Sequence, residues 1–241
     1  MTITGVNSNV LKKGDPEPSA PAAGTYRLYN MRFCPWAERA LIYLSAKGVP
    51  TEVVNIHLME KPEWYFKKHY QGKVPALEHD GRIVIESGVI PEYLDDLLPE
   101  NRFLLSDPYE KAQQKLLLER LSVVVPAFYG LFSLIKDASA KEEKLGNLKK
   151  ALDEAEQLLQ HEFFSGSKAG YVDFLIFPFF ERIWWVSDIA GFAFPSPDHP
   201  KVAKWFKATS ELPEIARVIQ PLEKGHLFIK SYADGKPDYD V

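Results

Sequence analysis

The first hundred residues alternate between short apolar stretches and amphipathic stretches. Residues 25–31 (TYRLYNM) predict a strand, and residues 34–47 predict a helix because apolar side chains recur there at every third and fourth position. Residues 51–58 (TEVVNIHL) predict a second strand with alternate apolar side chains on one face. A strand, a helix and a strand of these lengths form one βαβ unit, whose crossover is expected to be right-handed.

The next segment continues this pattern and adds an antiparallel pair. It predicts, in chain order, a short helix and two strands, at residues 61–69, 74–79 and 82–86. Asp80-Gly81 between the two strands is a strong signal for a two-residue hairpin. A further helix is expected after Ser87, so this part of the chain predicts an α/β domain with a mixed sheet.

Beyond Pro99 the strand pattern stops and only helical patterns remain. Asp107 and Pro108 are a typical N-cap and first helical residue, and the helix is expected to reach about residue 136, with a kink at Pro126. Further helices are expected to begin near Ser139 and near Gly170, and shorter ones to follow around residues 200–210 and 213–220. We therefore expect a disordered extension over 1–23, an α/β domain over 24–100, a linker near 99–107 and an all-helical domain over 107–241.

Composition and charge exclude several classes of function. The 241 residues carry 29 basic and 33 acidic side chains, so no excess of cations is present to bind a nucleic acid backbone. The apolar runs are far shorter than the roughly 20 residues of a membrane-spanning helix, and the N-terminal residues lack the apolar core of a secretory signal. A single cysteine allows neither an intramolecular disulfide nor a cysteine-rich metal site, so we expect a cytoplasmic protein without a structural metal.

The single cysteine, Cys34, is the main candidate for chemistry. It follows the first predicted strand and precedes Pro35, which suits the first turn of a helix. Cysteines at helix N-termini have pKa values of about 3.5–7.5 instead of about 8.5. Ala37 stands where a Cys-x-x-Cys motif has its second thiol, so a soluble thiol must resolve any mixed disulfide. An inert core cysteine is the alternative, and the residues alone leave the two interpretations about equal.

Three weaker signals lie at or near the ends of the other predicted strands. At Val74-Pro75, either a cis bond exposes the Val74 backbone to a peptide-like ligand or a trans proline opens an edge strand. Ser87 is either an ordinary N-cap or part of an anion site at a helix N-terminus. Lys61 is either a solvated cation or a partner for a ligand carboxylate. Their joint placement indicates one site.

Several stretches of the chain together match a known pattern. MRFCPWAERALIYLSAKGVP, KPEWYFKK, GKVPALE, the Glu86-Ser87 pair and the stretch from DPYEKAQQKLLLER to FPFFERI resemble the omega class of cytosolic glutathione transferases. The resemblance extends from about residue 20 to the end of the sequence. It implies a thioredoxin-like N-terminal domain, an all-helical C-terminal domain and a homodimer. The C-terminal GKPDYDV is similar to insect members of the class.

This resemblance assigns roles to individual residues. Cys34 would be the nucleophile that forms a mixed disulfide with glutathione, the co-substrate. The residues implied around glutathione are Pro35, Trp36, Lys61, Lys73, Val74, Pro75, Glu86 and Ser87. The residues implied around a hydrophobic second substrate are Leu58, Phe128, Phe179, Arg182, Phe228 and Tyr232. The resemblance implies no metal.

The activities implied are thiol transfer, dehydroascorbate reduction, deglutathionylation and reduction of methylated arsenic acids, on a small electrophilic or oxidised substrate. The alternatives are a conjugating enzyme, a pyrimidodiazepine synthase-type enzyme and, from another class, a membrane-inserting protein like the chloride intracellular channels. Glu38, Arg39 and Lys47 make membrane insertion of that segment costly.

Three positions depart from the pattern of the class. Gly170 replaces the usual Ser or Thr before a helix, which should cost only a few tenths of a kcal/mol. Pro91 lies in the first turns of its helix and is expected to loosen it. Gly225 lies in a region where some relatives carry a tryptophan over the substrate site, so the substrate range stays open.

Overall fold

The structure, a computed structural model, describes residues 2–136 and 138–241, and the chain divides into two compact units. The first unit extends to Arg102 and includes two later segments, Arg217–Gln220 and Tyr239–Val241. The second unit comprises Phe103–Ala216 and Pro221–Asp238. The division after Arg102 lies inside the predicted linker, whereas the sequence patterns do not predict the two later segments.

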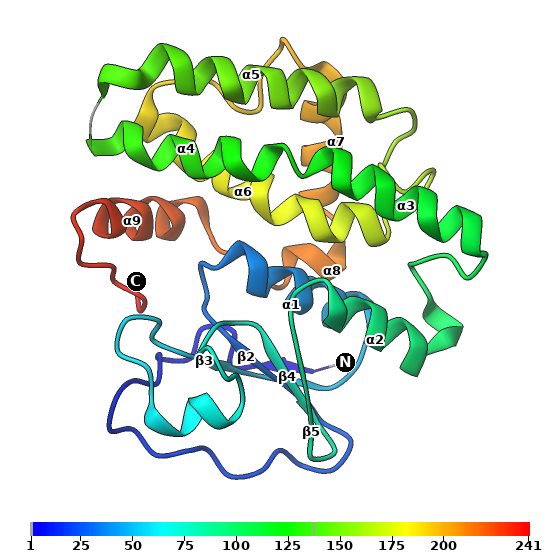
Figure 1. Ribbon diagram of the computed structural model, residues 1–241, viewed down its shortest axis with the longest axis vertical. Coiled ribbons are helices and arrows are strands. Elements are labelled where there is room, and N and C mark those ends of the chain that lie inside the picture. The colour runs from blue at the N-terminus through cyan, green and yellow to red at the C-terminus, as the bar shows by residue number, and fades with distance from the viewer. Residues whose placement is uncertain (1, 137) are drawn as a thin grey trace. The chain divides into compact units, whose positions relative to one another are not determined.

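The first unit is built on a five-stranded sheet in the order β1-β3-β2-β4-β5 (Figure 1). Its strands are β1 (Ile3–Thr4), β2 (Tyr26–Asn30), β3 (Thr51–Asn55), β4 (Ala76–His79) and β5 (Arg82–Ile85). β1, β3 and β2 are parallel, whereas β4 is antiparallel to β2 and β5 to β4. Asp80 and Gly81 both have positive φ, as a tight hairpin turn requires, so the predicted mixed sheet and hairpin are confirmed.

Two α-helices lie on one side of this sheet, α1 (Pro35–Lys47) and α2 (Val89–Leu97), while the 3-10 helix η1 (Glu63–Lys67) lies on the other (Figure 1). A second 3-10 helix, η2 (Pro99–Asn101), follows α2. Lys47 forms a 2.6 Å ion pair with Asp95, and both side chains are fully buried, which joins the two α-helices. Pro91 is the third residue of α2, where a backbone N–H has no partner within the helix. The proline therefore removes no hydrogen bond from α2.

The N-terminal segment differs from the disordered extension expected over residues 1–23. β1 lies beside β3 in the sheet, and Leu11 forms a further parallel bridge with Ile56. The backbone N–H of Lys13 donates to the oxygen of Glu60 at 2.9 Å. These contacts correct the expectation, because a Pro- and Ser-rich composition does not reveal that a strand edge offers backbone partners.

The second unit is entirely helical in its described residues. Its elements are α3 (Pro108–Leu121), α4 (Val124–Lys136), η3 (Ala138–Ala140), α5 (Lys141–Leu158), α6 (Tyr171–Ala190), α7 (Pro200–Ser210), α8 (Pro213–Ala216) and α9 (Leu222–Ala233). One kinked helix was expected up to about residue 136, but the structure has two helices, because α3 ends at Leu121 and α4 begins at Val124. Pro126 explains the break, because a proline ring clashes with the carbonyl four residues earlier, which is that of Ser122.

α6 forms the centre of the helical unit, as its apolar sequence predicts. Phe180 packs against Trp205 at a ring-centre distance of 4.9 Å, and Phe177 stacks on Phe206 at 5.4 Å. All four side chains are buried. In the described part of the chain, no helix is both long enough and apolar enough to cross a membrane.

The N-terminus of α6 is held by side chains other than that of its N-cap residue, Gly170. The hydroxyl oxygen of Ser165 accepts a hydrogen bond from the backbone N–H of Val172 at 3.2 Å. The carboxylate of Asp173 accepts hydrogen bonds from the N–H groups of Phe164 at 2.8 Å and Gly170 at 3.0 Å. Ser165 therefore supplies the acceptor that an N-cap Ser or Thr would provide.

Candidate active site

Cys34 is the N-cap residue of α1. Its backbone oxygen accepts the first helical hydrogen bond, from Glu38 N–H at 3.0 Å, and its N–H donates to Met31 O at 2.8 Å. Pro35 is the first helical residue, as predicted. Cys34 is largely buried, with 9% of its surface exposed. The first N–H groups of a helix lack intrahelical partners, so this position favours a negative charge on the sulfur.

Trp36 follows in the first turn of α1 and is half-buried. The guanidinium of Arg39 lies over its indole ring, 4.6 Å from the ring centre. This cation–π contact holds the indole against α1. The aromatic side chain next to Cys34 therefore has a partner on its own helix.

The hydroxyl of Tyr29 is bonded within the first unit and is not available to a ligand. Its hydroxyl donates to a carboxylate oxygen of Glu78 at 2.6 Å, and its side chain is fully buried. Burial, followed by the hydrogen bond to Glu78, raises the pKa of Tyr29 to about 12. Lys68 donates to both oxygens of the same carboxylate at 3.0 Å. Tyr29 is therefore a neutral donor held in a buried network.

Tyr65 and Lys61 both contact the loop before β4, the first by a hydrogen bond and the second by packing. The Tyr65 hydroxyl donates to the backbone oxygen of Lys73 at 2.6 Å. Burial raises the pKa of Tyr65, and its electrostatic interactions with Tyr29 and Cys34 add to this effect. Gly72 has a φ of +63°, and a Cβ there would lie 2.7 Å from Cδ of Lys61. The Lys61 stem therefore lies against Gly72, in the loop that carries Lys73.

Val74 follows this loop and is 8% exposed. The Val74-Pro75 peptide bond is cis. β4 begins one residue after Pro75, and its pairing with β2 includes Ala76. Val74 thus lies just outside the paired part of β4.

Glu86 and Ser87 connect β5 to α2. Glu86 is exposed and has a φ of +78°, a conformation that is costly for a residue with a side chain and that is enriched at active sites. Its backbone oxygen accepts hydrogen bonds from the N–H groups of Val89 and Ile90 at 3.1 and 3.0 Å. The N-cap residue of α2 is Gly88, so the interpretation of Ser87 as its N-cap is not supported.

His69, which sequence reasoning did not single out, interacts electrostatically with Lys73 of one loop and with Glu86 of the other. It is 2% exposed, and its backbone oxygen accepts from Gly72 N–H at 2.7 Å. Burial lowers the pKa of His69, the charge of Glu86 opposes this effect, and the charge of Lys73 adds to it. Both charged residues therefore act electrostatically on one imidazole. A lone histidine in an amphipathic stretch offers no sequence signal for this role.

The aromatic residues expected around a second substrate gather in the helical unit. Phe128, Phe179 and Phe228 are buried, whereas Tyr232 is 49% exposed. Ring contacts of 6.4 Å between Phe128 and Phe179 and of 6.0 Å between Phe228 and Tyr232 connect them in pairs. Phe132, which sequence reasoning missed, joins the pairs, with ring-centre distances of 5.0 Å to Phe128 and 5.4 Å to Tyr232.

Two further residues expected around the second substrate lie elsewhere. Arg182 is 1% exposed, pairs with Glu181 and stacks 4.3 Å from the ring centre of Trp185, so it belongs to the interior of the helical unit. Leu58 belongs to the first unit and is half-buried. The structure therefore brings four of the six expected residues into one aromatic cluster.

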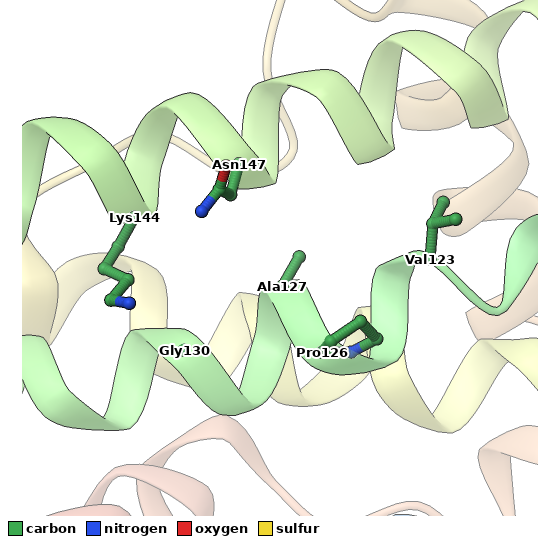
Figure 2. A pocket seen from close by; sticks show the side chains of 6 residues that line it. All are labelled: Val123, Pro126, Ala127, Gly130, Lys144 and Asn147. Carbon is green, nitrogen blue, oxygen red and sulfur yellow. The ribbon is translucent and has the colours of Figure 1, made fainter.

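A cavity of about 200 Å³ lies between α4 and α5 (Figure 2). It is lined by Val123, Pro126, Ala127, Gly130, Lys144 and Asn147. At about 3.6 residues per turn, the lining residues of α4 share one face, and Phe128 and Phe132 lie on the opposite face. The cavity therefore contains none of the residues expected around a substrate. Among the described residues, no group of three or more His, Cys, Asp or Glu side chains could hold a metal ion.

A thioredoxin-like sheet with a cysteine at the start of α1, followed by an all-helical unit, is the architecture of a glutathione transferase. Family models match the chain as "Glutathione S-transferase, N-terminal domain" over residues 28–102 and "Glutathione S-transferase, C-terminal domain" over residues 103–213. A solved tau-class glutathione S-transferase from mango, Mangifera indica, is 26% identical with a TM-score of 0.77, over 85% of this chain and 97% of that one.

Within this superfamily, several similar relatives are named as omega-class enzymes. The chain is 56% identical over 247 residues to a probable glutathione transferase omega-2 of Caenorhabditis briggsae, which covers 99% of this chain and 98% of that protein. The chain therefore belongs to the omega class of the glutathione transferase family, whose members use glutathione as a substrate.

The pyrimidodiazepine synthase of Drosophila melanogaster is a more distant relative. It is 34% identical over 247 residues, which covers 98% of this chain and 97% of that protein. Because the nematode protein is more similar than this insect protein, the comparisons do not confirm the expected insect affinity.

Proposed function

We propose that this chain is a glutathione-dependent thiol transferase and reductase with Cys34 as its nucleophile. The position of Cys34 at the N-cap of α1 carries the proposal, because it favours the thiolate over the thiol. A helix N-terminus stabilises a negative charge by about 0.3–1 kcal/mol at exposed sites, and by more where water is excluded. Tyr29, a neutral and fully buried donor to Glu78, does not compete for this role.

In the proposed cycle, the Cys34 thiolate attacks the glutathione sulfur of a mixed disulfide between glutathione and a substrate thiol. The bond between Cys34 and glutathione forms as the substrate thiolate leaves and takes up a proton. A second glutathione, as its thiolate, attacks the same sulfur, which yields oxidised glutathione and regenerates the Cys34 thiolate. A cysteine of low pKa is a good leaving group in this second step. With dehydroascorbate, two glutathione thiols supply the two electrons and two protons.

The geometry supports a glutathione site around Cys34 in the first unit. Lys61 and Lys73 offer cations to a ligand carboxylate, and the Val74 backbone lies outside the paired part of β4. Glu86 and Ser87 stand at the start of α2, where a helix N-terminus can bind an anionic group. We assign the γ-glutamyl end of glutathione to this turn, and Pro35 and Trp36 to the surroundings of its sulfur.

The second substrate is proposed to be a small electrophilic or oxidised molecule, such as dehydroascorbate, a glutathionylated thiol or a methylated arsenic acid. Phe128, Phe179, Phe228 and Tyr232 form the aromatic cluster of the helical unit that would contact it. We further propose a cytoplasmic homodimer, as its class leads us to expect.

The proposal is tested with Cys34→Ala and Cys34→Ser. Both variants should lose glutathione-dependent reduction of dehydroascorbate and of a model disulfide, because no other cysteine is present to form the mixed disulfide. Incubation of the parent protein with oxidised glutathione should add one glutathione to Cys34, as measured by mass spectrometry. Full reductase activity in Cys34→Ala would exclude the mechanism. The urea midpoint of both variants serves as the control for folding.

A pyrimidodiazepine synthase-type activity is the second candidate, favoured by the Drosophila relative. It would use the same glutathione site, so the choice between substrates rests on turnover measurements. Comparison of rates with a chlorinated aromatic compound and with dehydroascorbate separates conjugation from reduction. Conjugation as the main reaction is disfavoured because a cysteine favours disulfide exchange over the stabilisation of a free glutathione thiolate.

A further inference from the structure

Arg32 lies two residues before Cys34 and contacts two other segments of the first unit. Its Nη1 donates to the backbone oxygen of Val241 at 2.9 Å, and its Nη2 donates to that of Ser8 at 2.9 Å. Nη2 also lies 3.7 Å from a carboxylate oxygen of Asp240. The Arg32 side chain is only 2% exposed. A charge is retained at such depth only where it is well paired, so these contacts fix the guanidinium.

The two segments that contact Arg32 also hold each other. The carboxylate of Asp240 accepts a hydrogen bond from the backbone N–H of Val10 at 2.9 Å. The ring of Tyr239 packs edge-on against that of His57, with 4.5 Å between the ring centres. We call residues 8–11 and 239–241, which meet at Arg32, the clasp. Its two segments are more than two hundred positions apart in sequence but adjacent in the first unit.

The clasp is also tied to the strand ends that precede the Cys34 turn. The side-chain N–H of Asn55 donates to the oxygen of Ser8 at 3.0 Å, so this oxygen accepts from both Asn55 and Arg32. Asn30, the last residue of β2, donates to the Asn55 side chain at 2.9 Å. From Asn30 the chain reaches Cys34 through one tight turn, closed by the hydrogen bond from Cys34 N–H to Met31 O. The clasp is therefore adjacent to the turn between Met31 and Cys34.

We infer that Arg32 is a positioning residue that, together with the clasp, holds the turn before Cys34 so that the sulfur stays at the N-terminus of α1. The inference rests on the proposed role of Cys34 and adds the means by which that role is maintained. An arginine suits this task because its rigid fork can donate to Val241 and Ser8 at once, which the single ammonium of a lysine cannot do in the same geometry.

If the turn is released, the sulfur moves away from the helix N-terminus and its pKa rises toward the ordinary value of about 8.5. Each unit of increase lowers the thiolate fraction at neutral pH by up to about tenfold. The effect should therefore be visible in the reactivity of Cys34 without any glutathione chemistry.

The test compares three variants by the rate of Cys34 alkylation with iodoacetamide between about pH 5 and pH 10. Deletion of Tyr239–Val241 and the substitution Arg32→Lys should each lower the rate at pH 7 about three- to tenfold and move the profile to higher pH. Arg27→Lys is the matched control, because Arg27 is also buried and binds Glu52 through two nitrogens, but lies near the other end of β2. It should lower the urea midpoint and leave the alkylation profile unchanged.

An unchanged profile in the deletion variant would overturn the inference, even if Arg32→Lys moved it, because Arg32 would then act without the clasp. A shift in Arg27→Lys as large as that in Arg32→Lys would also overturn it, since general loosening would explain both. Asp240→Asn is the milder variant if the deletion does not fold, and should slow alkylation at pH 7 about two- to threefold; no change would contradict the inference. Because alkylation needs no glutathione, this result is independent of whether Cys34→Ala abolishes turnover.

Discussion

Ser165→Ala should destabilise the helical unit through the N-terminus of α6. The variant removes the hydroxyl that accepts from Val172 N–H at 3.2 Å and leaves this N–H in a fully buried residue. Loss of an N-cap acceptor costs about 0.5–2 kcal/mol, and an unpaired buried donor costs about 1–3 kcal/mol. Because Asp173 still accepts from Phe164 and Gly170, we expect a loss of about 1–2 kcal/mol.

Gly170→Ser tests whether the two positions share one role. A Cβ at Gly170 would lie 3.1 Å from both Cβ and Oγ of Ser165, so the added side chain crowds the existing acceptor. The single variant should therefore be neutral or destabilising, although serine is a good N-cap residue. In the Ser165→Ala background the same substitution should recover stability, with a coupling free energy of about 1 kcal/mol.

Urea unfolding followed by circular dichroism measures these differences. Ser210→Ala is the control, because the Ser210 hydroxyl donates to Lys207 O within its own helix and should change stability by less than about 0.5 kcal/mol. The alkylation rate of Cys34, in the other unit, should stay unchanged. A Ser165→Ala variant as stable as the parent, or a Gly170→Ser variant more stable than it, would refute the reasoning.

Two further predictions concern stability. Gly225→Ala should destabilise the protein by about 1–3 kcal/mol or more, because its Cβ would lie 2.3 Å from the buried ring of Trp185. The control Gly146→Ala should be neutral or stabilising, because open space surrounds its Cβ. Equal effects of the two variants on urea unfolding would contradict this prediction. Burial alone would raise the pKa of Glu78, but the hydroxyl and ammonium groups that bond its carboxylate lower it below 4.5. Stability from Glu78 should therefore be complete above about pH 4.5 and lost as pH falls through the lowered pKa; a Glu78→Gln variant with the same acid dependence as the parent would refute this.

Local patterns in the sequence predict much of the fold. Asp80-Gly81 predicts its hairpin because only a few residue types tolerate the positive φ values of that turn. Asp107 predicts the start of α3, where its carboxylate accepts from the N–H groups of Tyr109 and Glu110. The break at Ser122 was within reach of the same reasoning, since the clash of Pro126 with the fourth carbonyl before it is local. A kink was expected instead because the apolar pattern continues across the break.

The candidate site also contains some features that local sequence patterns predict and others that they do not. Cys34-Pro35 after a strand predicts a cysteine at a helix N-terminus, and the structure has this arrangement. His69 and Tyr65 act through a loop of irregular shape, for which no periodic pattern exists. Arg182 was expected in a substrate site only because of the resemblance to the omega class, whereas its partners on the same helix keep it in the interior.

The sequence by itself predicted the helices and strands from β2 to α2, the hairpin and the cysteine at the start of a helix, because each depends on residues within a few positions of one another. It did not predict β1, the break between α3 and α4, or α9. Only the tertiary structure decided that residues 8–11 and 239–241 meet at Arg32. It also decided that the Ser165 hydroxyl accepts a hydrogen bond from the first turn of α6, and that Trp185 packs on Gly225. These contacts join backbone groups or side chains that no local pattern relates. Their partners are selected by shape and hydrogen-bonding capacity only after the chain has folded.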